Sequence, residues 1–142
     1  MKKLICLSGI SGVGKTYRRT TDPKLKDLPY VDIADIYCDN PGIDAGQAFV
    51  MMYNEAMMLL EEHDTVVLEA WFRSGSRQRQ FIEHYAPDNY EVQYIELDAP
   101  VEVCVQRIVE QYETEKNAAD PVSLERLSRY HEARLSLLRS VG

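Results

Sequence analysis

The chain has 142 residues, 45% of them hydrophobic and 27% charged, and this balance predicts one compact globular domain spanning residues 1–142. The net charge of −7 argues against an extended surface for long nucleic acid, because phosphate neutralisation dominates such binding; a nucleic-acid end or base stays open as a ligand. We expect neither a membrane span nor a signal peptide, since the apolar runs are short. The three cysteines are scattered and lack a C-x-x-C pair, which indicates reduced thiols in a cytoplasmic protein.

The first predicted elements are a strand over residues 3–7 and a phosphate-binding loop directly after it. The strand is continuously apolar, which is typical of a central strand in a parallel sheet. Residues 9–16, GISGVGKT, fit the pattern G-x-x-x-x-G-K-[ST]. Its glycines let backbone N–H groups turn inward at a helix N-terminus, where the dipole also favours an anion. The predicted nucleotide-binding residues are Gly9, Ser11, Gly12, Val13, Gly14, Lys15 and Thr16.

Within this loop, Lys15 is expected to reach the β- and γ-phosphates of ATP and to act in catalysis, and Thr16 offers a hydroxyl to Mg²⁺. The helix that begins there lacks an apolar stripe, and Pro23 disfavours helical geometry at the residue before it, so we expect a short helix. A second strand is predicted over residues 29–33, and its end should bring Asp35 to the rim of the sheet.

The rest of the chain alternates helices and strands. The remaining predicted elements are a helix after the N-cap Asp44 with its apolar face over 45–60, a strand over 65–69, a helix over 76–85, a strand over 91–97, a helix through about residue 111, and a last helix that begins at Asp120-Pro121 and ends near residue 139. This alternation predicts an α/β fold of the three-layer P-loop NTPase type, with a short parallel sheet of about four strands covered by helices on both faces.

The carboxylates expected at the site follow from this sheet, because ligands bind beyond the carboxyl ends of its strands. Asp35 is predicted to take the proton of an acceptor hydroxyl or to orient it; a helix cap or turn residue is the alternative. Asp32 competes for this role but falls within the predicted strand. Glu69 ends a strand beside the loop strand, where it either holds Mg²⁺, directly or through water, or is a plain strand-end carboxylate.

Arginines supply the remaining candidates. Arg73 and Arg77, with Arg79 nearby, offer guanidinium forks for a substrate phosphate, and a solvated helix face is the alternative for each. Arg107 lies on the helix after the fourth strand, where a lid would place it over the transferring phosphoryl group. Its alternative is a surface ion pair with a neighbouring glutamate, which would contribute little. The three histidines show no spacing that indicates a metal site.

The pattern as a whole resembles the small P-loop kinases, a group that includes polynucleotide 5′-hydroxyl kinases, zeta toxins and gluconate-type sugar kinases. The resemblance covers nearly the whole chain. The GISGVGKT loop carries it most specifically, and softer support comes from the segments YVDIADIY, TVVLEAWFRSGSRQR and YIELDAPVEVCVQRI. The resemblance implies an acceptor-activating carboxylate at Asp35 and a lid arginine at Arg107.

The chain departs from that group in three places. Glu69 stands where an aspartate is usual, Gln111 stands where many members carry a second lid arginine, and the first helix is polar and stopped by Pro23. The absent second arginine argues against polynucleotide kinase activity in particular.

The sequence therefore predicts an ATP- and Mg²⁺-dependent kinase that moves the γ-phosphoryl group to a hydroxyl of a small metabolite, sugar, nucleoside, nucleotide or nucleic acid. Its expected partners are a nucleotide and a small hydroxyl-bearing substrate, with no membrane. One alternative is a nucleotide-binding module without transfer, which Gln111 and the unusual first helix support. Another is plain ATP hydrolysis, with Glu69 activating water. The N-K-x-D motif that reads guanine is absent, which argues against a GTPase switch.

Overall fold

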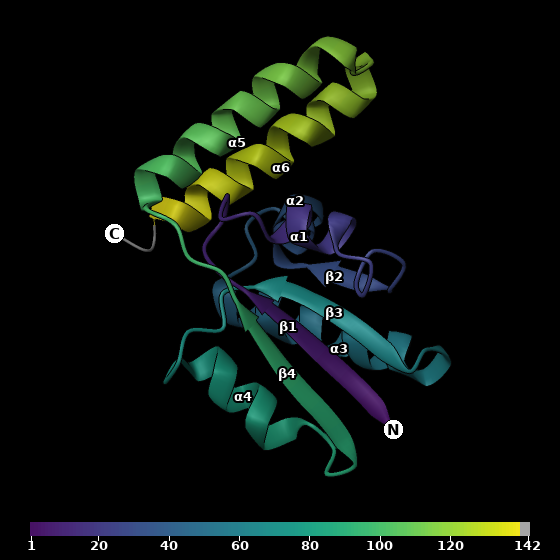
Figure 1. The fold of residues 1–142 in the computed structure, drawn as a ribbon. Coiled ribbons are helices and arrows are strands. Elements are labelled where there is room, and N and C mark those ends of the chain that lie inside the picture. The colour runs from purple at the N-terminus through teal and green to yellow at the C-terminus, as the bar shows by residue number, and fades with distance from the viewer. Residues whose placement is uncertain (140–142) are drawn as a thin grey trace.

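A computed structural model describes residues 1–139 of the chain. Within that range, four strands form one parallel sheet, with helices packed around it (Figure 1). The spatial order is β2-β3-β1-β4, so that β1 lies between β3 and β4. The strands are β1 Lys2–Ser8, β2 Tyr30–Asp32, β3 Thr65–Ala70 and β4 Tyr90–Glu96. The predicted α/β fold with a short parallel sheet is confirmed.

The strand register brings the predicted site to one edge of the sheet. Leu7 is level with Glu69, and Ser8 with Ala70, where β1 and β3 run side by side. Asp32 pairs with Glu69 from the other side, in the ladder between β2 and β3. Because parallel strands share one carboxyl edge, both carboxylates lie next to the loop that follows β1.

Helices cover one face and the carboxyl edge of the sheet, and the turn over residues 23–27 packs on the other face. The bounds of the helices are α1 Lys15–Thr21, α2 Ile33–Asp39, α3 Ala45–Glu62, α4 Arg77–Tyr85, α5 Val101–Glu115, the 3-10 turn η1 Lys116–Ala118 and α6 Pro121–Arg139. Figure 1 shows α5 and α6 as an antiparallel hairpin that stands beyond the carboxyl ends of the strands. Of the helices in residues 1–139, none has both the length and the apolar character that a bilayer span requires.

Apolar side chains are buried on both faces of the sheet. On one face, Leu4 and Leu68 pack with Met52 of α3, in the largest apolar cluster. On the other face, Ile5 and Val67 pack against Leu25, which follows the short first helix. Hydrophobic burial on both sides explains why β1 and β3 are continuously apolar rather than alternating.

The region after β2 differs from the sequence prediction. The strand expected over 29–33 ends at Asp32, and residues 33–39 form a helix, α2, that the sequence analysis did not predict. The reason is local, because the Asp32 carboxylate accepts a hydrogen bond from the backbone N–H of Ala34 at 2.9 Å and so caps the helix as soon as the strand ends. Asp35 therefore lies in the first turn of α2 rather than at the tip of a strand.

Candidate functional site

The loop after β1 is curved by two glycines in the left-handed region. Gly12 has φ +82° and Gly14, the N-cap of α1, has φ +110°, both values that side chains disfavour. A Cβ atom on Gly12 would lie 2.5 Å from the carbonyl oxygen of Cys104 in α5. The loop is thus held against the first turns of α5, and a residue other than glycine does not fit there without displacement.

Lys15 folds back over this loop. Its Nζ donates hydrogen bonds to the carbonyl oxygens of Gly9 at 2.6 Å and Ile10 at 2.8 Å. Burial lowers the Lys15 pKa to about 8, and the nearby carboxylates of Asp32 and Glu69 partly oppose that effect. The ammonium group is therefore poised where an incoming anion would compete with two neutral carbonyl groups.

Glu69 is tied to α1 through both of its carboxylate oxygens. Thr16 Oγ1 donates to Oε1 at 2.9 Å, and Arg19 Nε donates to Oε2 at 2.6 Å. The Arg19 guanidinium also lies 3.5 Å from the centre of the Tyr30 ring. Burial raises the Glu69 pKa, with the charge of Asp32 adding to the rise and Arg19 and Thr16 opposing it. Arg19, one turn after Lys15, can be noted from the sequence as a basic residue of the first helix, but its pairing with Glu69 appears only in the structure.

These groups line one cavity of about 370 Å³ at the carboxyl edge of the sheet. Its walls come from the loop and α1, the end of β2, the end of β3 and the α5–α6 hairpin. The lining residues used below are Gly12, Lys15, Thr16, Asp32, Glu69, Arg107, Gln111, Tyr130 and Arg134.

The donor set fits a nucleotide polyphosphate with Mg²⁺. The glycine loop meets a helix N-terminus, and Lys15 adds a cation for phosphate oxygens. Magnesium prefers oxygen ligands, which the Thr16 hydroxyl and the Glu69 and Asp32 carboxylates offer in the same cavity. Since Glu69 already binds Arg19 and Thr16, a water-mediated contact to the metal suits it better than a direct one.

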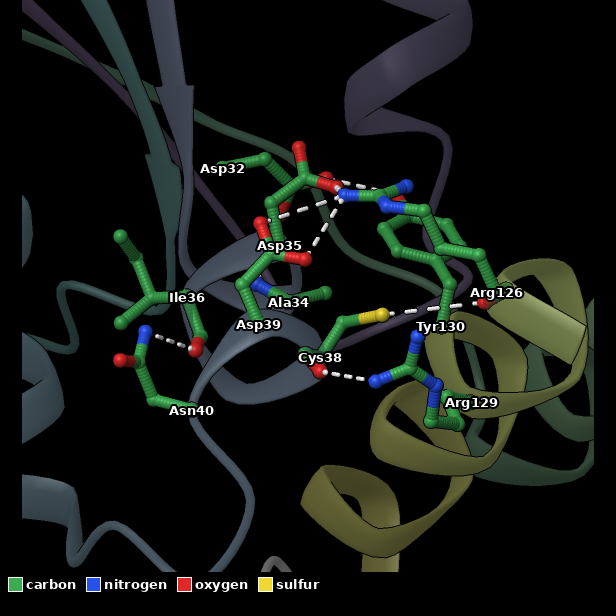
Figure 2. Close-up of polar contacts among 10 residues, drawn as sticks. All are labelled: Asp32, Ala34, Asp35, Ile36, Cys38, Asp39, Asn40, Arg126, Arg129 and Tyr130. Atoms are coloured by element: carbon green, nitrogen blue, oxygen red, sulfur yellow. Dashed lines mark hydrogen bonds and ion pairs between the residues drawn. The ribbon is translucent and has the colours of Figure 1, made fainter. Parts of the chain in front are cut away.

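The two aspartates near β2 occupy different places. Asp32 is buried and lines the loop cavity, and its Oδ2 accepts a hydrogen bond of 2.5 Å from the Tyr130 hydroxyl. Asp35 lines an adjoining recess instead, where it accepts a hydrogen bond from Arg126 Nη2 at 3.1 Å (Figure 2). The same Arg126 atom lies 3.3 Å from Asp39. Burial raises the Asp35 pKa, the charge of Asp32 adds to that rise, and Arg126 opposes it.

One face of α6 supplies three side chains to this region. Arg126, Tyr130 and Arg134 are spaced by four residues, so they project from the same side of the helix. Figure 2 shows Arg126 and Tyr130 pointing from α6 toward α2 and the end of β2. None of the three was predicted as a site residue, although the R-x-x-x-Y-x-x-x-R spacing is visible in the sequence.

Arg107 of α5 lies across the loop, as a lid residue would. Its Nη1 donates to the carbonyl oxygens of Val13 at 3.2 Å and Gly12 at 3.5 Å. Gln111, one turn later, accepts a hydrogen bond from Arg134 Nη1 at 2.8 Å. Gln111 therefore binds an arginine from the neighbouring helix, α6.

A second cavity of about 550 Å³ adjoins the first and shares Ser11, Lys15 and Ile33 with it. Tyr37 and Trp71 contribute aromatic rings to its wall, and the Arg73 guanidinium lies 5.4 Å from the Trp71 ring centre. The structure separates the three arginines that follow β3. Arg77 and Arg79 do not line this cavity. Arg77 is exposed at the start of α4. Arg79 binds Glu96 at 2.8 Å, and its guanidinium lies 3.9 Å from the Tyr94 ring centre.

Comparisons with known proteins bear on the fold. A scan of protein-family models and a search of curated proteins both find no match. Among solved structures, a chain of the Pnkp1/Rnl/Hen1 RNA repair complex matches with a TM-score of 0.61 and 21% identity, over 95% of this chain and 46% of that one. A presumed kinase from Chloroflexus aurantiacus matches with a TM-score of 0.57 and 22% identity, over 89% of this chain and 74% of that one. This chain thus spans about half the length of the first structure. At these identities the likeness is one of fold alone, an α/β fold with a parallel sheet.

Proposed function

We propose that this chain is an ATP- and Mg²⁺-dependent phosphotransferase that moves the γ-phosphoryl group of ATP to a hydroxyl acceptor. The proposal depends on one observation: Lys15, Thr16, two carboxylates and Arg107 converge on a single cavity around a glycine loop. Phosphoryl transfer needs positioning and charge stabilisation more than covalent chemistry, and this set supplies both. The three unpaired cysteines, all buried, accord with a reducing, cytoplasmic location.

On the donor side, the loop amides and Lys15 bind the polyphosphate. The Lys15 ammonium exchanges the carbonyl oxygens of Gly9 and Ile10 for phosphate oxygens, which carry full charge and make stronger hydrogen bonds. Arg107 stabilises the charge that spreads over the transferring group. Mg²⁺ held by Thr16 and, through water, by Glu69 would neutralise charge on the β- and γ-phosphate oxygens.

We assign the acceptor-activating role to Asp32 rather than to Asp35. Asp32 lines the same cavity as Lys15, whereas Asp35 lies one helical turn away and is bound to Arg126. As the new O–P bond forms and the bond to the ADP oxygen breaks, the acceptor proton passes to the Asp32 carboxylate. The short hydrogen bond from Tyr130 fixes the orientation of that carboxylate.

We place the body of the acceptor in the 550 Å³ cavity on the far side of Lys15. Ile33, the neighbour of Asp32, lines both cavities, so the acceptor hydroxyl would extend from this cavity into the loop cavity, where it meets Asp32. Tyr37 and Trp71 suit a planar ring, and Arg73 suits an anionic group on the same molecule. This chemistry favours a nucleoside or nucleotide, free or at the end of a nucleic acid, over a simple sugar.

Phosphoryl transfer from γ-labelled ATP to pools of nucleosides, nucleotides, oligonucleotides and sugars tests the proposal. D32N is expected to lower transfer on the order of 10²-fold with nucleotide affinity near wild type, and asparagine still caps α2. K15A should weaken nucleotide binding and turnover together. D39N is the matched control, because Asp39 also binds Arg126 but lies outside the loop cavity, and it should leave transfer unchanged.

Four results would contradict this proposal. If D35N lost transfer to the extent expected of D32N, and D32N lost none, Asp35 rather than Asp32 would activate the acceptor. Nucleotide binding without a labelled product in any pool would favour a nucleotide-binding module, and release of labelled phosphate alone would favour ATP hydrolysis. An unchanged K15A variant would remove the loop from the active centre.

A further inference from the structure

A buried histidine connects the two helices of the hairpin. His131 of α6 is 3% exposed, and its Nε2 lies 3.2 Å from Glu115 Oε2 at the end of α5. Its Nδ1 lies 3.0 Å from Arg134 Nη1, the same atom that donates to Gln111. Arg134 in turn lines the loop cavity. A continuous series of polar contacts thus runs from Glu115 to the phosphate cavity.

The chemistry of these groups fixes the protonation state of the ring. A guanidinium has donors and no acceptor, so Nδ1 of His131 must accept the hydrogen bond from Arg134. The ring hydrogen then resides on Nε2, which donates to the Glu115 carboxylate. His131 is therefore neutral when the contact with Arg134 is made.

Arg134 is a third cation in the cavity that Lys15 and Arg107 also line. Its charge acts at Lys15, where it lowers the lysine pKa as one of the weaker contributions. The guanidinium lies 5.5 Å from the Tyr130 ring centre, and Gln111 holds it from α5. Gln111 thus serves as an acceptor that orients an arginine from the opposite helix.

We propose that His131 is a positioning residue which, when neutral, holds Arg134 against the phosphate cavity, and which, when protonated, releases it. The inference rests on the proposed function of that cavity. A protonated ring would carry a hydrogen on Nδ1 and a positive charge 3.0 Å from a guanidinium, so the two groups would separate. Phosphoryl transfer should therefore weaken as the pH falls through the His131 pKa.

The surroundings of the ring set the direction of its titration. The groups that face it are Glu115 and the Tyr112 ring from α5, and Arg134 and the Tyr130 ring from α6. Burial lowers the His131 pKa most, Arg134 lowers it further, and Glu115 opposes both. The neutral form therefore predominates at neutral pH, and loss of function is confined to the acidic side.

Two substitutions separate positioning from simple packing. H131N keeps an acceptor atom near the Nδ1 position but does not titrate, so it should retain transfer at pH 7.5 and lose less activity than wild type as the pH falls, since only the carboxylates of the cavity still titrate. H131L has no acceptor, and it should lower kcat about tenfold. R134A should lower kcat on the order of 10²-fold and should also weaken ATP binding, because the Arg134 guanidinium lines the cavity that holds the polyphosphate. R129A is the matched control on α6, because Arg129 donates to the Cys38 carbonyl outside the cavity, and it should behave as wild type.

Two readouts do not depend on turnover. Histidine nitrogen NMR should show the Nε2–H tautomer for residue 131, and an Nδ1–H tautomer would overturn the inference. ATP binding by calorimetry at pH 7.5 and 5.5 should differ more for wild type than for H131N, since protonation of the ligand is common to both. Equal differences, or an acidic limb in H131N identical to that of wild type, would refute the role of His131. Absence of transfer in wild type would instead refute the proposed function, and ATP binding and NMR would still decide this inference.

Discussion

Replacing Arg19 with methionine should destabilise the protein through the carboxylate that it leaves behind. The Glu69 side chain is 1% exposed and the Arg19 side chain 11%, and the two are joined by a contact of 2.6 Å. Removing one partner of such a buried pair costs about 3–5 kcal/mol, because the other charge stays buried without compensation. At about 3 °C per kcal/mol for a chain of this size, the melting temperature should fall by roughly 10–15 °C.

The pH dependence identifies the cause. Without Arg19, the pKa of folded Glu69 rises further above its unfolded value, so the folded variant binds a proton that the unfolded chain releases. The free energy of unfolding of R19M should therefore fall furthest below that of wild type at pH 7, and this difference should shrink toward pH 5.

Urea unfolding of R19M, E69Q and the double variant at both pH values forms a double-mutant cycle. The double variant R19M/E69Q should regain most of the stability that R19M loses, because it buries no uncompensated charge. A loss below about 1 kcal/mol in R19M, or a deficit that does not change with pH, would refute this reasoning.

Two further predictions concern the loop. Since the Lys15 pKa is lowered to about 8, ATP affinity should fall about tenfold per pH unit above that value; calorimetry at pH 7 and 9.5 measures this, and K15R, which keeps its charge, should show little of that fall. G12A should cost more stability than G42A, because both glycines have φ near +80° but only a Cβ on Gly12 meets another atom, the Cys104 carbonyl oxygen at 2.5 Å. Thermal unfolding of the two variants compares the costs, and equal losses would show that the loop does not press against α5.

The fold was predictable because its signals are local. The glycine loop, the continuous apolar strands and the caps at Asp44 and Asp120 each lie within a few residues of the element that they define. The helix over residues 33–39 was missed because the carboxylate of Asp32 ends a strand and caps a helix at the same position. The spacing of apolar residues does not show where a strand ends when its last residue is also the cap of the next helix.

The composition of the candidate site was less predictable, because its polar contacts join distant parts of the chain. Arg19 meets Glu69 across 50 residues, and Tyr130 meets Asp32 across 98. Neither pair is marked by spacing in the sequence. Gln111 shows the same limit. In the sequence it stands where many small P-loop kinases carry an arginine, but in the folded hairpin it contacts Arg134 of the other helix.

Three side chains on one face of α6 connect the acceptor side of the proposed site with the side that binds the phosphate donor. Arg126, Tyr130 and Arg134 follow one another at intervals of one turn, and they meet Asp35, Asp32 and the polyphosphate cavity in that order. Because these side chains belong to one helix, a tilt or slide of α6 would displace Tyr130, which binds Asp32, together with Arg134, which lines the loop cavity. Evolution of this chain toward a different acceptor is therefore constrained, because substitutions that shift α6 to fit a new substrate would also change how the nucleotide is bound.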